Sequence, residues 1–204
     1  MKAKEHSQEA LFEHPVLERL SKTNFPLHVI WYLSTTALLV YLGFQRAHVN
    51  LSQALGLFVT GLISWSLIEY LMHRYVFHFV TENYYVQRFH HIFHGIHHAH
   101  PRDEKRTMMP PLPGALITLL YLGIFYLVLS EKAFIFVGGI ILGYLIYSGL
   151  HYCIHQYKPP KHLKFLWQHH HIHHHKEPEK AFGVSSRIWD RIFGTMPDLG
   201  KSKS

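Results

Sequence analysis

Histidine is the residue type in this sequence whose number and spacing could do chemistry. The chain has 21 histidines among 204 residues, far more than an ordinary fold needs. Histidine is the commonest metal-ligating side chain, and its neutral imidazole suits zinc, copper, iron and nickel. The composition therefore predicts a metal site. The histidines that matter gather in four clusters, at residues 73–78, 94–98, 151–155 and 169–175.

Two of these clusters have the spacing of one helix face. Side chains at positions i, i+3 and i+4 of a helix lie on the same side. His94, His97 and His98 follow this pattern, as do His151 and His155. A pair at i and i+4 can chelate one ion, and the histidine at i+3 can reach a second ion. The spacing thus favours two metal ions close together.

The first cluster needs a distorted helix, and the last cluster is ambiguous. His73 and His78 lie about 140° apart on an ideal helix, so they share an ion only if the helix ends or distorts between them. Within the last cluster, two triplets have the required spacing: His170, His173 and His174, or His171, His174 and His175.

Counting these side chains gives a set of ten imidazoles, whichever triplet is used. Ten are too many for one ion and suit two, whereas a structural zinc site uses four ligands, often including cysteine. The clusters therefore predict a dimetal centre. Five isolated histidines are expected to be surface or core residues without a metal: His6, His14, His28, His48 and His162.

Two carboxylates are candidates for orienting the ligand histidines. Glu69 precedes His73 by four residues, on the same helix face and near a membrane edge, where an ionisable group usually has a partner. We expect it to hydrogen-bond the second ring nitrogen of a ligand histidine. Asp190, in the segment IWDRIFGT, is a similar candidate, whereas Asp103 is expected to be a loop residue.

The elements that must position these histidines are apolar helices. Four stretches have about the 20 residues that a helix needs to cross a bilayer. Short turns join the first to the second and the third to the fourth, so we predict two helical hairpins and an all-α membrane protein. The four predicted spans are residues 27–45, 51–72, 112–130 and 133–152.

Four spans place every histidine cluster on one side of the membrane. Of the 20 Lys and Arg residues, only Arg46 and Lys132 fall in the two opposite turns, and the other 18 lie on the histidine-rich side. Basic residues stay in the cytosol, so the metal cap is expected to face it. The predicted organisation is an N-terminal segment at 1–26, a four-span domain at 27–195 with its cap from 73–111 and 151–195, and a tail at 196–204.

Charge and cysteine content exclude other classes. A formal net charge of +7 could indicate nucleic acid or an anionic membrane surface. With four apolar spans the membrane is the better partner, and no nucleic-acid binding is expected. The single Cys153 excludes an intramolecular disulfide framework. The first 20 residues contain no apolar signal-peptide core.

Several stretches resemble the fatty acid hydroxylase family, and within it the fatty acid 2-hydroxylases. They run in order over about residues 55–195: IEYLMHRYVFH, FHGIHHAHPRDEKRTMMPP, LLGYLIYSGLHYCIH and LKFLWQHHHIHHHKEPEKAFGVSSRIWDRIFGT. The resemblance implies a four-helix membrane base under a cytosolic cap with two metals. It also implies which triplet of the last cluster is used, because the family's HxxHH motif stands at a fixed distance before an FG pair. The implied ligands are His73, His78, His94, His98 and His173 for one metal, and His97, His151, His155, His170 and His174 for the other.

The resemblance further implies the reaction, a hydroxylation of a lipid acyl chain with iron and O2, with carbon 2 as the expected position. Two iron ions are the expected cofactor, and zinc can replace them in purified samples because histidine sites prefer it. The eukaryotic 2-hydroxylases often carry an N-terminal haem domain. This chain begins about 26 residues before its first span, so a separate electron-transfer protein is expected. Where the family often has Asp, this chain has Ser148, which puts one contact near the metals in doubt.

Other functions remain open on the sequence alone. Within enzymes they are sterol desaturation, carotenoid ring hydroxylation and hydroxylation of an aminolipid acyl chain. Outside enzymes, a histidine-rich metal transporter or metal store predicts ionisable residues along a path through the spans. Tyr144, Tyr147 and Tyr152 are expected either to belong to an interfacial aromatic belt or to line the route of an apolar substrate.

Overall fold

The computed structural model of the chain describes residues 10–79 and 81–198. Most of the predicted tail and the first nine residues, with His6, lie outside the described part. Within it the chain forms helices and no strand, so the prediction of an all-α protein is confirmed.

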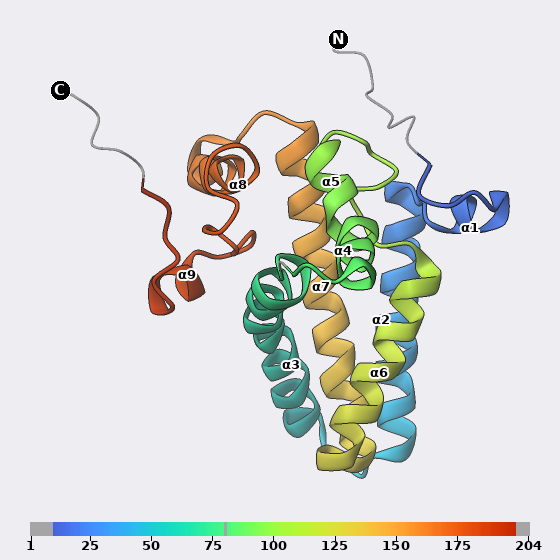
Figure 1. The fold of residues 1–204 in the computed structure, drawn as a ribbon. Coiled ribbons are helices and arrows are strands. Elements are labelled where there is room, and N and C mark those ends of the chain that lie inside the picture. The colour runs from blue at the N-terminus through green and yellow to red at the C-terminus, as the bar shows by residue number, and fades with distance from the viewer. Residues whose placement is uncertain (1–9, 80, 199–204) are drawn as a thin grey trace.

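Four long helices form the base of the molecule (Figure 1). Each runs antiparallel to the one before it along the chain, and α7 lies in the middle, in contact with the other three. The helices begin and end within a few residues of the predicted stretches. At its C-terminal end α7 continues four residues further than predicted, which places the whole third histidine cluster on one helix. The four are α2 (Phe25–Arg46), α3 (Leu51–Met72), α6 (Pro111–Leu129) and α7 (Ala133–Gln156).

Local sequence fixes the ends of these helices. Asn24 caps α2 by accepting a hydrogen bond from the backbone N–H of Leu27. Asn50 and Gln53 form a reciprocal capping box at the start of α3. The α6 helix ends where Ser130 adopts a positive φ of 49°, which reverses the chain and starts α7 through the short 3-10 turn η3 (Ser130–Lys132).

Three helical stretches are long and apolar enough to cross a membrane: Phe25–Arg46, Leu51–Phe77 and Pro111–Gln156. The third has 46 residues and includes both α6 and α7. A straight helix of that length would be about 69 Å long, more than twice the roughly 30 Å thickness of a hydrocarbon core, but the chain turns back at η3. A membrane protein is thus supported, while the division into four spans stays a prediction.

Glycines allow α7 to approach its neighbours closely. A Cβ atom added to Gly61 of α3 would lie 2.0 Å from the carbonyl oxygen of Phe136, and one added to Gly139 of α7 would lie 2.1 Å from that of Phe58. Only glycine fits at such crossings, and small residues serve the same purpose in membrane helix packing generally. This contact fixes α3, which leads directly into the first histidine cluster, against α7, which carries the third.

The remaining elements lie at one end of the bundle and along its upper side (Figure 1). They come from the N-terminal segment, from the connection between α3 and α6, and from the chain after α7. Together they form the cap. Its elements are α1 (Pro15–Leu20), η1 (His73–Phe77), α4 (Tyr84–His90), η2 (His91–Gly95), α5 (Ile96–Ala99), η4 (Lys161–Leu163), α8 (Lys164–His175) and α9 (Ile188–Ile192).

Candidate metal centre

The helix distortion required by the first histidine cluster is present. Residues His73–Phe77 form a π-helical turn, η1, directly after α3. The backbone N–H of His78 donates to the carbonyl oxygen of His73, at 3.1 Å. A π-turn contains one residue more than an α-turn, so residues five apart come to lie on one side of the helix. The imidazole rings of His73 and His78 accordingly lie 5.0 Å apart between centroids.

Five histidines from three parts of the chain form the first group. The Nε2 atoms of His73 and His94 are 3.0 Å apart, as are those of His94 and His98. Those of His173 and His78 are also 3.0 Å apart. Two ligands at right angles around one ion, each about 2.1 Å from it, would be about 3.0 Å apart. The group is His73, His78, His94, His98 and His173, and one nitrogen from each lies within 4.8 Å of the others.

The second group lies beside the first. The Nε2 atom of His155 is 3.2 Å from that of His151 and 2.9 Å from that of His170. The rings of His98, in the first group, and His174, in the second, are stacked with centroids 4.1 Å apart, so the two groups are in contact. The second group is His97, His151, His155, His170 and His174, again with one nitrogen from each within 4.8 Å of the others. The two groups have the same members as the two ligand sets implied by the resemblance.

Burial of the imidazoles in the cap lowers their pKa, which favours the neutral form at physiological pH. Burial, followed by the neighbouring histidines, lowers the pKa of His78 to about 3 and that of His98 to about 2. Burial lowers the pKa of His173 to about 4. A neutral imidazole has a free lone pair, which is the form that binds a metal. Burial also lowers the pKa of the other cap members of the two groups: His94, His97, His170 and His174.

Two backbone carbonyls fix which nitrogen of a ring carries the proton. His73 Nδ1 lies 2.5 Å from the carbonyl oxygen of Phe182, and His173 Nδ1 lies 2.7 Å from that of Lys180. A carbonyl can only accept, so in both neutral rings Nδ1 donates and Nε2 keeps its lone pair. His73 and His173 both belong to the first group, so both Nε2 lone pairs are available to a metal ion held there. Ala181, between the two carbonyls, has a positive φ of 58°, a strained conformation for a residue with a side chain.

Several buried ring nitrogens in the second group have no protein partner. In the described part of the chain, neither nitrogen of His97 or His174 makes a hydrogen bond, and neither does Nδ1 of His170. An unsatisfied buried polar atom is costly and rare in native proteins. A metal ion coordinated by one nitrogen each of His97 and His174 would satisfy one of the two unpartnered nitrogens on each of these rings.

Among the described residues Glu69 makes no hydrogen bond to a ligand histidine, so the expectation that it orients one directly is wrong. The Glu69 carboxylate accepts from the backbone N–H groups of Val184 and Ser185, at 2.7 and 2.9 Å, and from the Ser185 hydroxyl. The Glu69 side chain extends from α3 to the loop between α8 and α9. Two backbone N–H groups of this loop donate to the buried carboxylate. Glu69 therefore positions the loop whose Phe182 carbonyl orients His73.

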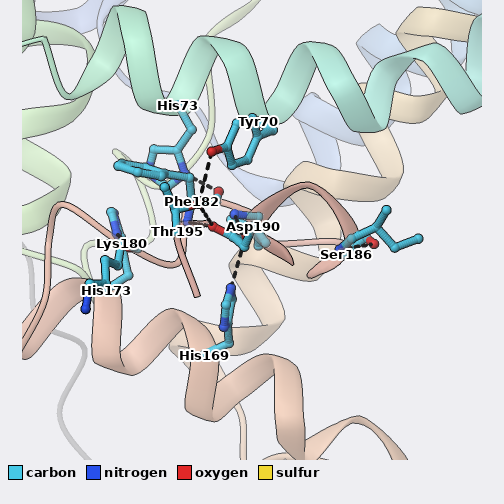
Figure 2. A network of polar contacts seen from close by, with 12 residues as sticks. Tyr70, His73, His169, His173, Lys180, Phe182, Ser186, Asp190 and Thr195 are labelled. Atoms are coloured by element: carbon cyan, nitrogen blue, oxygen red, sulfur yellow. Dashed lines mark hydrogen bonds and ion pairs between the residues drawn. The ribbon is translucent and has the colours of Figure 1, made fainter. Parts of the chain in front are cut away.

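Asp190 also acts on this loop and not on a metal-group histidine (Figure 2). It accepts from the backbone N–H groups of Phe182 and Gly183, both at 2.9 Å, and from the Thr195 hydroxyl at 2.7 Å. Its fourth partner is His169 Nε2 at 3.0 Å. Burial opposes ionisation of Asp190, but the hydrogen bonds from His169, Thr195 and Gly183 outweigh it and lower the pKa of the carboxyl group.

Sequence reasoning missed three features around the centre. His169, adjacent to the metal-group residue His170, is the partner of Asp190 and belongs to neither group. The two orienting groups are backbone carbonyls, which no side-chain pattern reveals. His28, expected to be a surface or core residue, is a fully buried core residue, but its partner was not foreseen: the Ser148 hydroxyl lies 2.7 Å from its Nε2.

An apolar cavity of about 390 Å³ reaches the two histidine groups from the bundle. His94 of the first group and His97 and His151 of the second line its upper end. The wall below them is mostly apolar and comes from α3, α6 and α7. Tyr144 and Tyr147 line this cavity, which favours a substrate route for them over an aromatic belt. Tyr152 does not line it and is stacked on Phe25, with ring centroids 4.8 Å apart.

Comparisons with known proteins agree with one another. The profile of the family described as fatty acid hydroxylase matches residues 58–195. The chain is 36% identical over 151 residues to the dihydroceramide fatty acyl 2-hydroxylase FAH2 of Arabidopsis thaliana. The aligned region covers 71% of this chain and 62% of the relative. The chain is also 36% identical over 216 residues to fatty acid 2-hydroxylase of Homo sapiens. That aligned region covers 91% of this chain and 56% of the relative. The chain thus spans less than two thirds of either relative.

A solved structure shares the fold. It is that of full-length scs7p, with only the hydroxylase domain visible, and it superimposes with a TM-score of 0.82 at 31% identity. The match covers 89% of this chain and 69% of that one.

Proposed function

Because the chain belongs to the fatty acid hydroxylase family, we propose that it hydroxylates the acyl chain of a lipid at carbon 2, using two iron ions held by the two histidine groups. The observation that carries this proposal is the apolar cavity whose upper end is lined by His94, His97 and His151. A cavity of this kind fits a hydrocarbon chain and brings it directly to the candidate metal ligands. The relatives named as 2-hydroxylases support carbon 2 as the position.

The donor set fits the chemistry that the reaction needs. Insertion of oxygen into an unactivated C–H bond requires a redox-active metal, which zinc is not. Two iron ions with O2 would supply that oxidation. In the balanced reaction, one oxygen atom of O2 enters the C–H bond and the other leaves as water, with two electrons and two protons taken up. The electrons come, in this proposal, from a separate electron-transfer protein.

The chain's own residues hold, orient and shield the centre. The Phe182 and Lys180 carbonyls keep the Nε2 lone pairs of His73 and His173 available to a metal. The carboxylates of Glu69 and Asp190 hold the loop that carries these carbonyls. The apolar wall of the cavity keeps water from the reacting carbon and admits a hydrocarbon chain.

We further propose that α2, α3, α6 and α7 each cross the membrane and that the cap faces the cytosol. The support is the reversal of the chain at Ser130 and the placing of the cap elements at one end of the bundle (Figure 1). The 18 Lys and Arg residues outside the two opposite turns would then all be cytosolic, as the positive-inside rule requires.

Expression in a host without a lipid 2-hydroxylase, followed by mass spectrometry of the host lipids, tests the function. Acyl chains should gain one oxygen, and fragmentation should place it at carbon 2. The matched pair of variants is His174→Ala and His175→Ala. They are adjacent on α8, but only His174 belongs to a histidine group. His174→Ala should abolish the product and His175→Ala should retain it.

Two results would contradict the proposal. Lipids without any added oxygen would exclude this activity on the lipids of that host. Equal product from both variants would show that the histidine groups are not the site of the reaction.

A further inference from the structure

A hollow on the surface of the cap lies between the start of α8 and α9, outside the apolar cavity. It has a volume of about 270 Å³. Two arginines and two serines line it, and no acidic residue of the described chain does. None of its lining residues lines the apolar cavity, so the two are separate. The residues of this α9 hollow are Phe165, Ser185, Ser186, Arg187, Ile188 and Arg191.

The two arginines of the α9 hollow have unused hydrogen-bond donors. Within residues 10–79 and 81–198, neither Arg187 nor Arg191 donates a side-chain hydrogen bond or forms an ion pair. The Arg187 guanidinium lies 4.5 Å from the centroid of the Phe165 ring, a contact that holds the group in place without an acidic partner. The two arginines are four residues apart, which puts them on one side of a helix. Such a pair is suited to an anion.

The one carboxylate of α9 does not neutralise this pair. Asp190 is fully buried and is directed into the protein, toward His169 and Thr195 (Figure 2). With its two backbone contacts it already receives four hydrogen bonds. The outer surface of residues 187–192 therefore presents positive charge only.

The α9 helix packs beside the upper end of α3 (Figure 1), which is apolar enough to cross a membrane. Trp189 Nε1 donates to the Ser66 hydroxyl at 3.1 Å, and the Phe193 ring is stacked on that of Tyr70 with centroids 5.1 Å apart. Ser66 precedes His73 by seven residues, or about 10 Å along the helix. These contacts therefore lie within the apolar stretch and not beyond its end.

The exposed face of α9 combines apolar and basic side chains. Ile188 and Ile192 are 58% and 62% exposed, and their spacing of four residues puts them on one side of the helix. Phe193, directly after the helix, is exposed as well. A short segment with an apolar side next to arginines is typical of the bilayer interface, where apolar groups enter the hydrocarbon and guanidinium groups reach the phosphates.

We propose that the α9 hollow binds the phosphate of an anionic membrane phospholipid. Guanidinium groups match phosphate oxygens in geometry as well as in charge, and basic pockets beside membrane helices bind anionic headgroups on the cytosolic side. The exposed isoleucines, Ile188 and Ile192, would contact the acyl chains of the same lipid. This lipid is bound outside the apolar cavity and is not the substrate. The inference goes beyond the proposed reaction and depends only on α3 as a membrane helix.

A lipid in the α9 hollow would also stabilise the loop that supports the metal centre. Ser185, which lines the hollow, donates through its hydroxyl to Glu69. The next residue beyond the hollow on the helix, Asp190, holds the backbone of Phe182, whose carbonyl orients His73. Because a ligand that binds only the folded state stabilises it, lipid binding should raise the melting temperature of the protein.

Lipid titration of the full chain in nonionic detergent tests the site without any need for activity. Native mass spectrometry measures the binding of phosphatidylglycerol and of phosphatidylcholine. Both contain phosphate, but only phosphatidylglycerol has a net negative headgroup. The double variant Arg187→Gln/Arg191→Gln removes the basic pair. The control variant Arg102→Gln/Lys105→Gln removes the same charge at exposed positions between α5 and α6. If the first double variant does not fold, Arg191→Gln alone, at an exposed position, takes its place.

Phosphatidylglycerol should bind the unaltered chain more tightly than phosphatidylcholine and raise its melting temperature. Loss of the arginine pair should lower the affinity for phosphatidylglycerol at least about tenfold, and the control variant should retain it. Equal binding of the two lipids, or an equal loss in both double variants, overturns the proposal, because general charge attraction would then suffice. Inorganic phosphate that raises the melting temperature as much as phosphatidylglycerol also overturns it, since the site would then take the free anion.

Discussion

His73 Nδ1 and the Phe182 carbonyl oxygen lie 2.5 Å apart although the two residues are separated by 109 positions in the chain. This contact joins the end of a long apolar helix to a loop near the C-terminus. The loop is in turn held by Asp190, which receives four hydrogen bonds (Figure 2). The orientation of a candidate metal ligand therefore depends on a carboxylate that never contacts it.

Asp190→Asn should weaken both the fold and the metal centre. An amide has one acceptor oxygen in place of two, so at least one buried donor loses its partner, at a cost of about 1–3 kcal/mol. Loosening the groups that support a ligand typically lowers metal affinity 10–100-fold. Thermal unfolding and metal analysis of the purified protein measure the two effects. Glu179→Gln, at an exposed position, is the control, and equal behaviour of both variants would show that the Asp190 network does not support the centre.

Acidification should destabilise the metal-free protein. Burial lowers the folded-state pKa of His173 to about 4 and, with neighbouring histidines, that of His78 to about 3, whereas an unfolded histidine has a pKa of about 6.5. The unfolded state therefore binds more protons below pH 6.5, and stability falls as the pH decreases from about 6.5 toward these folded-state values. Denaturant titrations at several pH values should show this slope, and stability independent of pH between 7 and 4 would contradict it.

Removal and return of metal should separate structure from catalysis. A chelator should lower the melting temperature, because an ion that binds only the folded state stabilises it. Zinc and iron(II) should each restore the melting temperature, since both suit imidazole ligands. Only iron should restore lipid hydroxylation, because zinc has no redox chemistry. Calorimetry and lipid mass spectrometry on the same samples check this, and full activity of the zinc-loaded protein would exclude an iron-dependent reaction.

A methyl group at the crossing of α3 and α7 should disrupt the bundle. The Cβ of Gly61→Ala would meet the Phe136 carbonyl oxygen at 2.0 Å, so the helices must separate, and overpacking of this kind typically costs about 1–3 kcal/mol. Gly56→Ala, five residues earlier on the same helix, meets nothing within 4 Å and should be neutral or slightly stabilising. Unfolding in detergent compares the two variants, and equal stability would mean that the helices do not need this close approach.

The sequence predicted the long helices well because membrane helices are governed by local composition. The second predicted stretch, 51–72, coincides with α3, since Asn50 and Gln53 start it and the histidine cluster ends its apolar run. The histidine clusters were also recognisable, because imidazoles at i, i+3 and i+4 have no comparable use in an ordinary fold.

The features that could not be predicted from the sequence depend on contacts between residues distant in the chain. Glu69 was identified as a residue that needs a partner, but the partner could not be predicted because the loop that reaches it is 115 residues away. The carbonyls of Lys180 and Phe182 carry no sequence signal at all. His28 and Ser148 lie 120 positions apart, and only their meeting in the bundle shows that the histidine has a buried partner.

The π-turn at His73–Phe77 lets this segment hold one residue more than an α-helical turn would. Deleting one residue between His73 and His78 would leave the two histidines four apart, and an ordinary α-turn would still place them on one side of the helix. Lengthening the segment by one residue would turn His78 away from its partners. This stretch should therefore tolerate the loss of one residue far better than the gain of one.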